Sequence, residues 1–477
     1  MQALAAIAAT NPVRTARALR KPDTELICVL LCHAGSLLRR PPWSITPLGA
    51  HPMLHQLLKS KEACRSIVTT QKQKPCIISW PAHLLGLLPG VITVLLNRGH
   101  QQPDDWASLW IGGRILREGL NEHLYDHNPE DFAAWSGPVW GSFVAETSPW
   151  PHPFVQAPVV AQVVGYLSEV ISFDTSVMLL TLANCWALVV LCASAYYLWF
   201  HRVAPIGWLA LGVLALYCTA AFQGSVFLGQ TSPLIYAGAA YAVSAARTRP
   251  LSSGLVLGCV ALVKLTPFAL IIVMFAFRDR VRAAVIAGLS SVMLLAVSAV
   301  TLGTEIYGTW RETLSYWAGT FISVPVAQSL PSVLLRNHYV ESDALVPVIH
   351  EAPSYVVWAP QVLAAVLLLG LVAAMMKQRR IRYELAVSVV LCTATATTGL
   401  VWLHYIIVIA LPIAGLLWLR QRWVIAVIFV FLLPPLAPLD LPGTHLPALM
   451  PGSGLLALVL ATAALLGVAL MKKEVTR

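Results

Sequence analysis

The sequence predicts an all-α fold: a polytopic bundle of transmembrane helices. Of its 477 residues, 57% are hydrophobic and only 11% are charged, whereas soluble domains are about 25% charged. Uncharged apolar stretches recur from Cys76 to the C-terminus, and several reach the roughly 20 residues that cross a bilayer. Such unbroken runs exclude an outer-membrane barrel. We expect about 11 or 12 membrane crossings, some of them in broken or re-entrant hairpins.

Residues 1–75 are strongly basic. They hold eleven lysines and arginines against three acidic residues, which is +8 of the net charge of +10. They contain neither a credible span nor the pattern of a cleavable signal peptide. We expect a cytoplasmic, largely disordered extension, followed by a membrane domain at residues 76–477. The other basic residues cluster between apolar segments, which is the positive-inside pattern and argues against a nucleic-acid partner.

The first half of the membrane domain follows from the charges at the ends of its apolar segments. The first span, Cys76–Asn97, follows Lys72 and Lys74, so it should begin in the cytoplasm. Residues 98–153 then form a long outward loop, with eight acidic and three basic residues. Phe154–Phe200 should hold a membrane-dipping piece and one full span. Pro205–Ala246 should hold two spans with an outward turn.

A single apolar stretch, Leu251–Phe277, lies between two basic clusters that should both face the cytoplasm. It is too short for two full spans at about 1.5 Å per residue. We therefore predict a broken or re-entrant hairpin with Lys264–Pro267 near its tip, since proline removes a helix hydrogen bond. Gly254 and Gly258 form a GxxxG pair, which should pack two helices closely.

The second half adds another long outward loop, residues 303–353. The basic-flanked stretch Glu384–Leu419 should turn near Thr397–Gly399, and both chain termini should be cytoplasmic. The two outward loops and the outward turns would then share one face. The remaining spans are predicted at Ala283–Leu302, Tyr355–Met376, Trp423–Pro438 and Gly454–Met471.

Lys264 is the only lysine or arginine inside an apolar stretch. A charge within a membrane is costly and indicates function by default, and a cation at a hairpin tip suits a phosphate. The alternative is a lysine that snorkels to the interface.

The acidic pair Asp104 and Asp105 opens a helix-like run just outside the first span. Aspartate there is either a helix cap or a general base near an acceptor hydroxyl. The pair also admits weak binding of a divalent cation; we expect no other cofactor. The nine cysteines form no CxxC pair, so neither a disulfide framework nor a zinc site is expected.

Four further polar residues lie at predicted outward positions. His404 follows Trp402 near an outward turn, and it is either a hydrogen-bonded interior residue or part of a site. His152, between two prolines, is a weaker candidate. Gln230 and Gln328 are either helix caps or ligands of a substrate.

Four blocks, in this order and spacing, resemble glycosyltransferase family 87. The likeness covers roughly Ile77 to Leu419. Trp150-Pro-His-Pro153 departs from the family's frequent Tyr-Pro-Pro, and Tyr405 replaces the second histidine of its Trp-x-His-His. The blocks are Asp105–Gly119 with Leu124-Tyr-Asp126, Gly229-Gln230 with Gly254–Gly258 and Lys264-Leu-Thr-Pro267, Gln328-Ser-Leu330 with Leu334-Leu-Arg336, and Trp402-Leu-His404-Tyr405.

The resemblance implies a GT-C fold in the cell (inner) membrane. It implies inverting transfer of a sugar from a polyprenyl-phosphate donor to a glycan or lipid acceptor at the periplasmic or exterior face. Mannose is the expected sugar, with arabinofuranose as an alternative. A transporter or flippase for lipid-linked glycans is a rival, although the sequence lacks the internal repeats that are common in transporters. The implied roles are catalysis by Asp105 and His404, binding of the donor phosphate by Lys264, Arg336 and His404, and binding of substrate by Gln230, Gln328, Trp402 and Tyr125.

Overall fold

A computed structural model describes residues 77–96, 101–148, 150–322, 324, 327–336, 344–433 and 452–473. The predicted extension at residues 1–75 lies outside the described residues. The helices from Trp80 to Leu302 are α5 (Trp80–Leu96), α6 (Asp104–Arg117), η1 (Asn121–His123), α7 (Pro138–Val144), α8 (Pro158–Ser168), α9 (Phe173–Phe200), α10 (Ile206–Tyr217), α11 (Ala220–Phe227), α12 (Ser232–Ala245), α13 (Pro250–Val263), α14 (Phe268–Phe275) and α15 (Val281–Leu302).

The rest of the described chain adds one short sheet to these helices. Strands β1 (Phe321–Ile322) and β2 (Val348–Ile349) pair antiparallel, with Phe321 opposite Ile349. The later helices are α16 (Glu305–Ala318), α17 (Leu330–Leu334), α18 (Ser354–Lys377), η2 (Arg379–Ile381), α19 (Arg382–Ala396), η3 (Leu403–Ile409), α20 (Ala410–Trp418), α21 (Arg422–Val430) and α22 (Ser453–Met471).

The described residues confirm an all-α, polytopic membrane fold. Four helices, α9, α15, α18 and α22, are long and apolar enough to cross a bilayer, and the bent pair α10–α11 makes a fifth candidate. The bend between α10 and α11 is 67°. Other predicted membrane segments contain shorter apolar helices, which are α5, α8, α13 and the continuous η3–α20. Breaks between helices are therefore frequent within the bundle.

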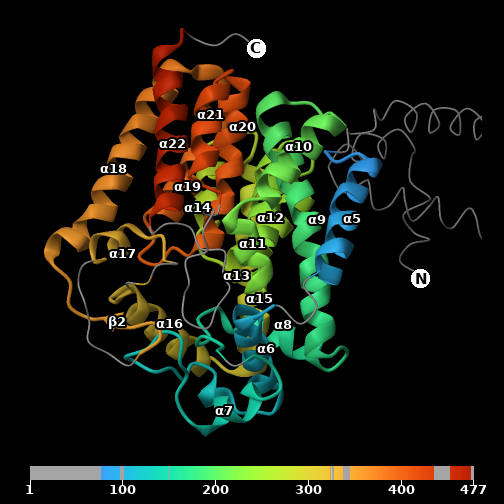
Figure 1. Ribbon diagram of the computed structural model, residues 1–477, viewed down its shortest axis with the longest axis vertical. Coiled ribbons are helices and arrows are strands. Elements are labelled where there is room, and N and C mark those ends of the chain that lie inside the picture. Colours follow the sequence, from blue (N-terminus) through green and yellow to red (C-terminus); the bar gives the residue numbers. More distant parts are fainter. Residues whose placement is uncertain are drawn as a thin grey trace, which may run out of the picture. The chain divides into compact units, whose positions relative to one another are not determined.

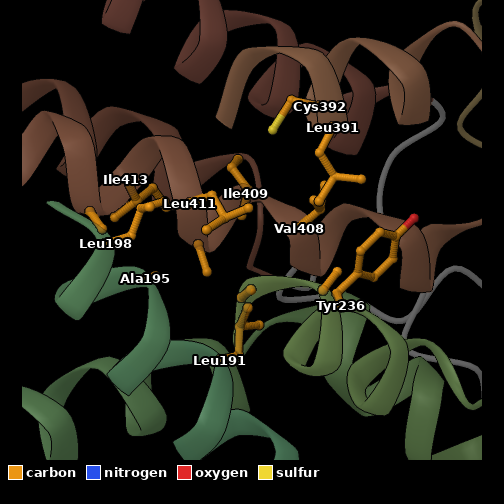
Figure 2. Close-up of a cluster of buried hydrophobic side chains, with 14 of the residues drawn as sticks. Leu191, Ala195, Leu198, Tyr236, Leu391, Cys392, Val408, Ile409, Leu411 and Ile413 are labelled. Atoms are coloured by element: carbon orange, nitrogen blue, oxygen red, sulfur yellow. The ribbon is translucent and has the colours of Figure 1, made fainter. Parts of the chain in front are cut away.

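The core of the bundle is built around α9 (Figures 1 and 2). Leu198 of α9 lies beside Ile413 of α20, while Tyr236 of α12 lies beside Val408 of η3 (Figure 2). Trp199 of α9 is fully buried, and its Nε1 donates a hydrogen bond to the backbone of α20. Apolar packing thus holds α20 against α9 and η3 against α12, and η3 carries part of the site described below.

The predicted GxxxG pair packs α13 directly against α15. A Cβ atom added at Gly254 would lie 2.5 Å from the Cβ of Ile286. One added at Gly258 would lie 2.1 Å from Ser290 Oγ and 2.7 Å from the carbonyl oxygen of Ala287. The serine side chain can rotate away, but the Ala287 backbone cannot, so position 258 requires glycine.

Gly258→Ala is expected to destabilise the protein by about 1–3 kcal/mol, the usual cost of overpacking. Gly288→Ala on α15 is the matched control, because a Cβ there meets nothing within 4 Å. The control should be neutral or slightly stabilising. Thermal unfolding of the purified protein in detergent measures both, and equal melting temperatures would contradict this account of the packing.

The two predicted outward loops contain helices of their own and are joined to each other. The first loop carries α6 and α7, and the second carries α16 and α17. The Asp131 carboxylate accepts hydrogen bonds from the backbone N–H groups of Leu345 (2.8 Å) and Val346 (2.9 Å). The N–H of Phe132 donates to the Val346 carbonyl (2.9 Å). We call this contact the Asp131 junction; it fixes Phe132 beside the pocket described next.

Candidate active site

The site forms where helices break. Lys264 is extended (φ −135°, ψ 133°) between α13 and α14, as the predicted hairpin break requires. Trp402 is extended just before η3. These breaks face the first turn of α6 around one pocket. The pocket is lined by Asp105, Leu109, Phe132, His152, Val155, Gln156, Gly229, Gln230, Thr231, Lys264, Leu400, Trp402 and Tyr405.

Gly229 brings the turn between α11 and α12 against α6. Its φ is +65°, a conformation in which glycine is favoured. A Cβ atom at this position would lie 2.9 Å from the Cβ of Trp106. The Asp105 N–H donates to the carbonyl of Leu228 (3.1 Å). This close approach sets Gln230 opposite the Asp105 side chain.

Asp105 is held by two partners from different parts of the chain. Gln230 Nε2 donates to Asp105 Oδ2, and His152 Nε2 lies 3.1 Å from Asp105 Oδ1. His152 Nδ1 is 2.7 Å from the Pro153 carbonyl oxygen, which can only accept, so Nδ1 carries a proton. Burial alone would lower the pKa of His152, but the hydrogen bond and charge of Asp105 outweigh it and raise that pKa. The contact with Asp105 therefore favours the protonated form of the His152 ring.

Lys264 enters the same pocket from the other side. Its Nζ donates to Ser232 Oγ (2.6 Å) and lies 3.5 Å from the centroid of the Tyr405 ring, a cation–π contact. Ser232 Oγ in turn lies 3.4 Å from Gln230 Oε1. Ser232 and Gln230 thus connect the ammonium of Lys264 to the carboxylate of Asp105 through hydrogen bonds.

Asp104 lies outside the pocket lining, unlike its neighbour Asp105. It is buried, and Oδ1 accepts a hydrogen bond from Ser148. Burial, with the adjacent charge of Asp105, raises the pKa of Asp104 to about 7, although the Ser148 bond opposes this. The two aspartates therefore differ in environment: one lines a cavity and the other is packed in the protein.

The raised pKa of Asp104 predicts a pH-dependent stability. In the folded protein Asp104 stays protonated up to about pH 7, whereas in the unfolded chain it ionises near pH 4. Asp104 should therefore favour the folded state most below pH 4, and this contribution should be lost as the pH rises to about 7. The loss is at most roughly 4 kcal/mol. Asp104→Asn should lack this loss of stability, so the melting temperatures of the wild type and the variant should converge or cross between pH 5 and 8. Parallel curves would contradict the assignment.

His404 and Gln328 lie close to the site but outside the pocket lining. His404 is buried in η3, its Nε2 has no hydrogen-bond partner among the described residues, and it interacts electrostatically with Lys264 and His152. Gln328 is fully buried, and its Oε1 accepts from the Gly454 N–H (3.0 Å) in the first turn of α22. Gln328 thus acts as a helix cap, one of the two roles that the sequence allowed.

Of the other predicted site residues, one lines the pocket, one is buried behind the pocket wall and one is exposed on the protein surface. Trp402 lines the pocket, with its ring 5.8 Å from that of Phe132. Tyr125 is buried behind the wall, where its hydroxyl donates to the Gln156 carbonyl (2.8 Å). Arg336 follows α17, is exposed and is not part of the lining. The structure therefore brings together Asp105, Gln230, Lys264 and Trp402, but not Arg336.

From the sequence, His152 was only a weak candidate and Ser232 was not a candidate. The prolines beside His152 were visible, but nothing in the sequence indicated that its ring would meet Asp105. Tyr405 appeared only as a departure from the family pattern, yet its ring lies under Lys264. Within the described ranges, no group of three or more His, Cys, Asp and Glu residues is placed to hold a metal ion.

Fold and site together define a multi-pass helical membrane protein with a pocket that holds the carboxyl group of Asp105 and the amino group of Lys264. The sequence model of glycosyltransferase family 87 matches residues 154–403, just over half of the chain. The chain therefore belongs to glycosyltransferase family 87, as its sequence motifs predicted. Asp105 and His152 precede the matched part. No curated protein and no solved structure matches the chain significantly.

Proposed function

We propose that this glycosyltransferase moves a sugar from a polyprenyl-phosphate donor to a glycan or glycolipid acceptor on the outer face of the cell membrane. Mannose is the expected sugar, and arabinofuranose is the alternative. The observation that carries the proposal is that Asp105 and Lys264 line one pocket. Direct displacement needs both a base for the acceptor and a cation for the leaving phosphate.

Asp105 is proposed as the general base. Its two oxygens each have one partner, Gln230 and His152, but a carboxylate offers about four acceptor positions. An acceptor hydroxyl can therefore still donate to it from the pocket. Gln230 and His152 fix the orientation of the carboxylate, as a base in a displacement reaction requires.

Lys264 is proposed to stabilise the leaving phosphate. The acceptor oxygen forms a bond to the anomeric carbon as the bond from that carbon to the phosphate oxygen breaks, and the acceptor proton passes to Asp105. Negative charge grows on the phosphate, where an ammonium in a partly dry pocket is most effective. Because Arg336 lies outside the lining, we give this role to Lys264, supported by His404, whose buried Nε2 lacks a partner among the described residues.

The test is transfer by the full-length protein in lipid nanodiscs. Labelled polyprenyl-phosphate mannose and polyprenyl-phosphate arabinofuranose are supplied in parallel with a panel of glycan and glycolipid acceptors. We expect label in a glycan product of inverted anomeric configuration, read by NMR. Retained configuration would overturn direct displacement. In vesicles, uncleaved lipid-linked sugar that crosses the bilayer would point to a flippase, a function that family membership does not favour.

A further inference from the structure

A second hollow region lies at the C-terminal end of α9, away from the candidate active site. Asn184 of α9 donates a hydrogen bond to the Gln230 carbonyl (2.8 Å), which places it at the level of that site. Phe200, the last residue of α9, is 16 residues further on, which is about 24 Å along a helix. There α9 ends beside α10, α20 and α21, toward the top of Figure 1.

The first part of this region is an arginine pocket of about 320 Å³, formed by Arg202, Arg420 and Arg422 with Tyr196, Phe200 and Trp418 among its walls. Among the described residues, none of the three arginines has a carboxylate within 4.0 Å, whereas other arginines, such as Arg114 and Arg117, do. Arg202 lies over the stacked rings of Tyr196 and Phe200 (6.0 and 5.8 Å to the ring centroids). Positive charge is thus concentrated without an acidic partner in the described part of the chain.

The turn between α20 and α21 keeps two of the arginines together. Arg420 has φ +63°, in a position after a helix where glycine is usual. Its N–H donates to the Leu417 carbonyl (3.0 Å), and the Gln421 N–H donates to the Leu416 carbonyl (2.9 Å). This Schellman turn reverses the chain within three residues, so Arg420 and Arg422 both line the pocket.

The second part is an apolar groove that adjoins the arginine pocket. It has a volume of about 170 Å³ and shares Tyr196, Trp208 and Leu417 with the arginine pocket. Small residues open it between α9, α10 and α20, among them Gly212 and Ala414. A hydrocarbon chain in the groove and an anion among the arginines would belong to one molecule.

We propose that the arginine pocket and the apolar groove bind one anionic phospholipid of the surrounding bilayer. Its headgroup phosphate would accept hydrogen bonds from Arg202, Arg420 and Arg422, since guanidinium groups bind phosphate in a fork geometry. One acyl chain would lie in the groove. Arginine and aromatic residues are common at any membrane interface, but here they line a cavity that leads between helices. Basic pockets of this kind bind anionic headgroups.

The test measures lipid retention by native mass spectrometry. The full-length protein in detergent is titrated with phosphatidylglycerol and, separately, with phosphatidylcholine of the same acyl chains. We expect tighter binding of phosphatidylglycerol, weakened about fivefold for each arginine replaced by glutamine and on the order of 100-fold in the triple variant. Arg379→Gln with Arg380→Gln is the matched control, because both residues are exposed and outside the pocket. It should bind like the wild type.

A second pair of variants tests the groove. Gly212→Leu places a side chain at the groove wall, where a Cβ would lie 3.3 Å from Cys192 Sγ. Gly207→Leu is the control on the same helix, because a Cβ there meets nothing within 4 Å. Only Gly212→Leu should weaken phosphatidylglycerol binding, by tenfold or more, with melting temperatures confirming that both variants fold.

Three results would overturn the proposal. Equal affinity for the two phospholipids would show that the pocket does not distinguish the net charge of the headgroup. A triple arginine variant that is folded and binds like the wild type would place the lipid elsewhere. Displacement of phosphatidylglycerol by equimolar polyprenyl phosphate, or by inorganic phosphate alone, would mean that the pocket takes a different anion. None of these outcomes depends on whether the protein transfers sugar, because lipid binding alone is measured.

Discussion

Asp105→Asn should lower the rate of sugar transfer by about 10²–10⁴, the usual contribution of a general base. The amide is nearly isosteric, so the fold should persist. It cannot take a proton from the acceptor, although its oxygen can still accept the hydrogen bond from Gln230 Nε2. Donor binding should change little, because the phosphate is assigned to Lys264. Single-turnover transfer and equilibrium donor binding, measured on the same preparation, separate the two effects.

Asp104→Asn is the matched control for this experiment. The neighbouring carboxyl is buried against Ser148 and does not line the pocket, so its amide variant should keep most of the transfer activity. Nearly normal turnover in Asp105→Asn, together with an inactive Asp104→Asn, would show that the base is Asp104 and would overturn the mechanism.

Lys264→Met should weaken donor binding by roughly 10–100-fold, which corresponds to about 1.5–3 kcal/mol for a hydrogen bond to a charged group. Transfer should fall as well, because the same ammonium serves the bound donor and the leaving phosphate. Methionine keeps the length and apolar character of the side chain, and Ser232 can still reach Gln230. Folding should therefore survive. Binding of polyprenyl phosphate, turnover and melting temperature are measured together.

Two further variants decide whether the charge at position 264 is functional. Lys264→Arg should recover only part of the activity, since a planar fork does not replace a compact ammonium over the Tyr405 ring. Lys473→Met, at an exposed position after α22, controls for loss of one positive charge and should behave like the wild type. If Lys264→Met unfolds the protein, or binds donor normally, the lysine serves structure instead.

Local sequence signals predicted the breaks that build the site. Pro267 and the basic flanks located the interruption at Lys264, and the charge pattern located the turn that contains Gln230. Such signals act within a few residues of the chain, where proline and glycine limit the backbone directly. Local signals of this kind are therefore enough to predict Lys264 and Asp105 as candidates, although not that they line one pocket.

Contacts across the chain could not be predicted in the same way. His152 meets Asp105 across 47 positions of sequence, and the Ser232–Lys264 bond spans 32; both depend on how helices pack. Gln328 was predicted to bind substrate, with a helix cap as the alternative, and only its contact with Gly454 identifies the cap. Arg336 shares a motif with Gln328 but is exposed and outside the pocket lining, because proximity in sequence does not by itself bring a side chain into a site.

The Asp131 junction has a consequence for how acceptor preference can diverge among related enzymes. It joins Asp131 to Leu345 and Val346, which lie 214 and 215 positions further along the chain. The adjacent Phe132 lines the pocket, as does Trp402. Neither of the two joined loops can be exchanged for another enzyme's loop without losing partners in the other. Acceptor specificity should therefore be inherited as a pair of segments that change together, and grafting both segments at once is the route to altering it.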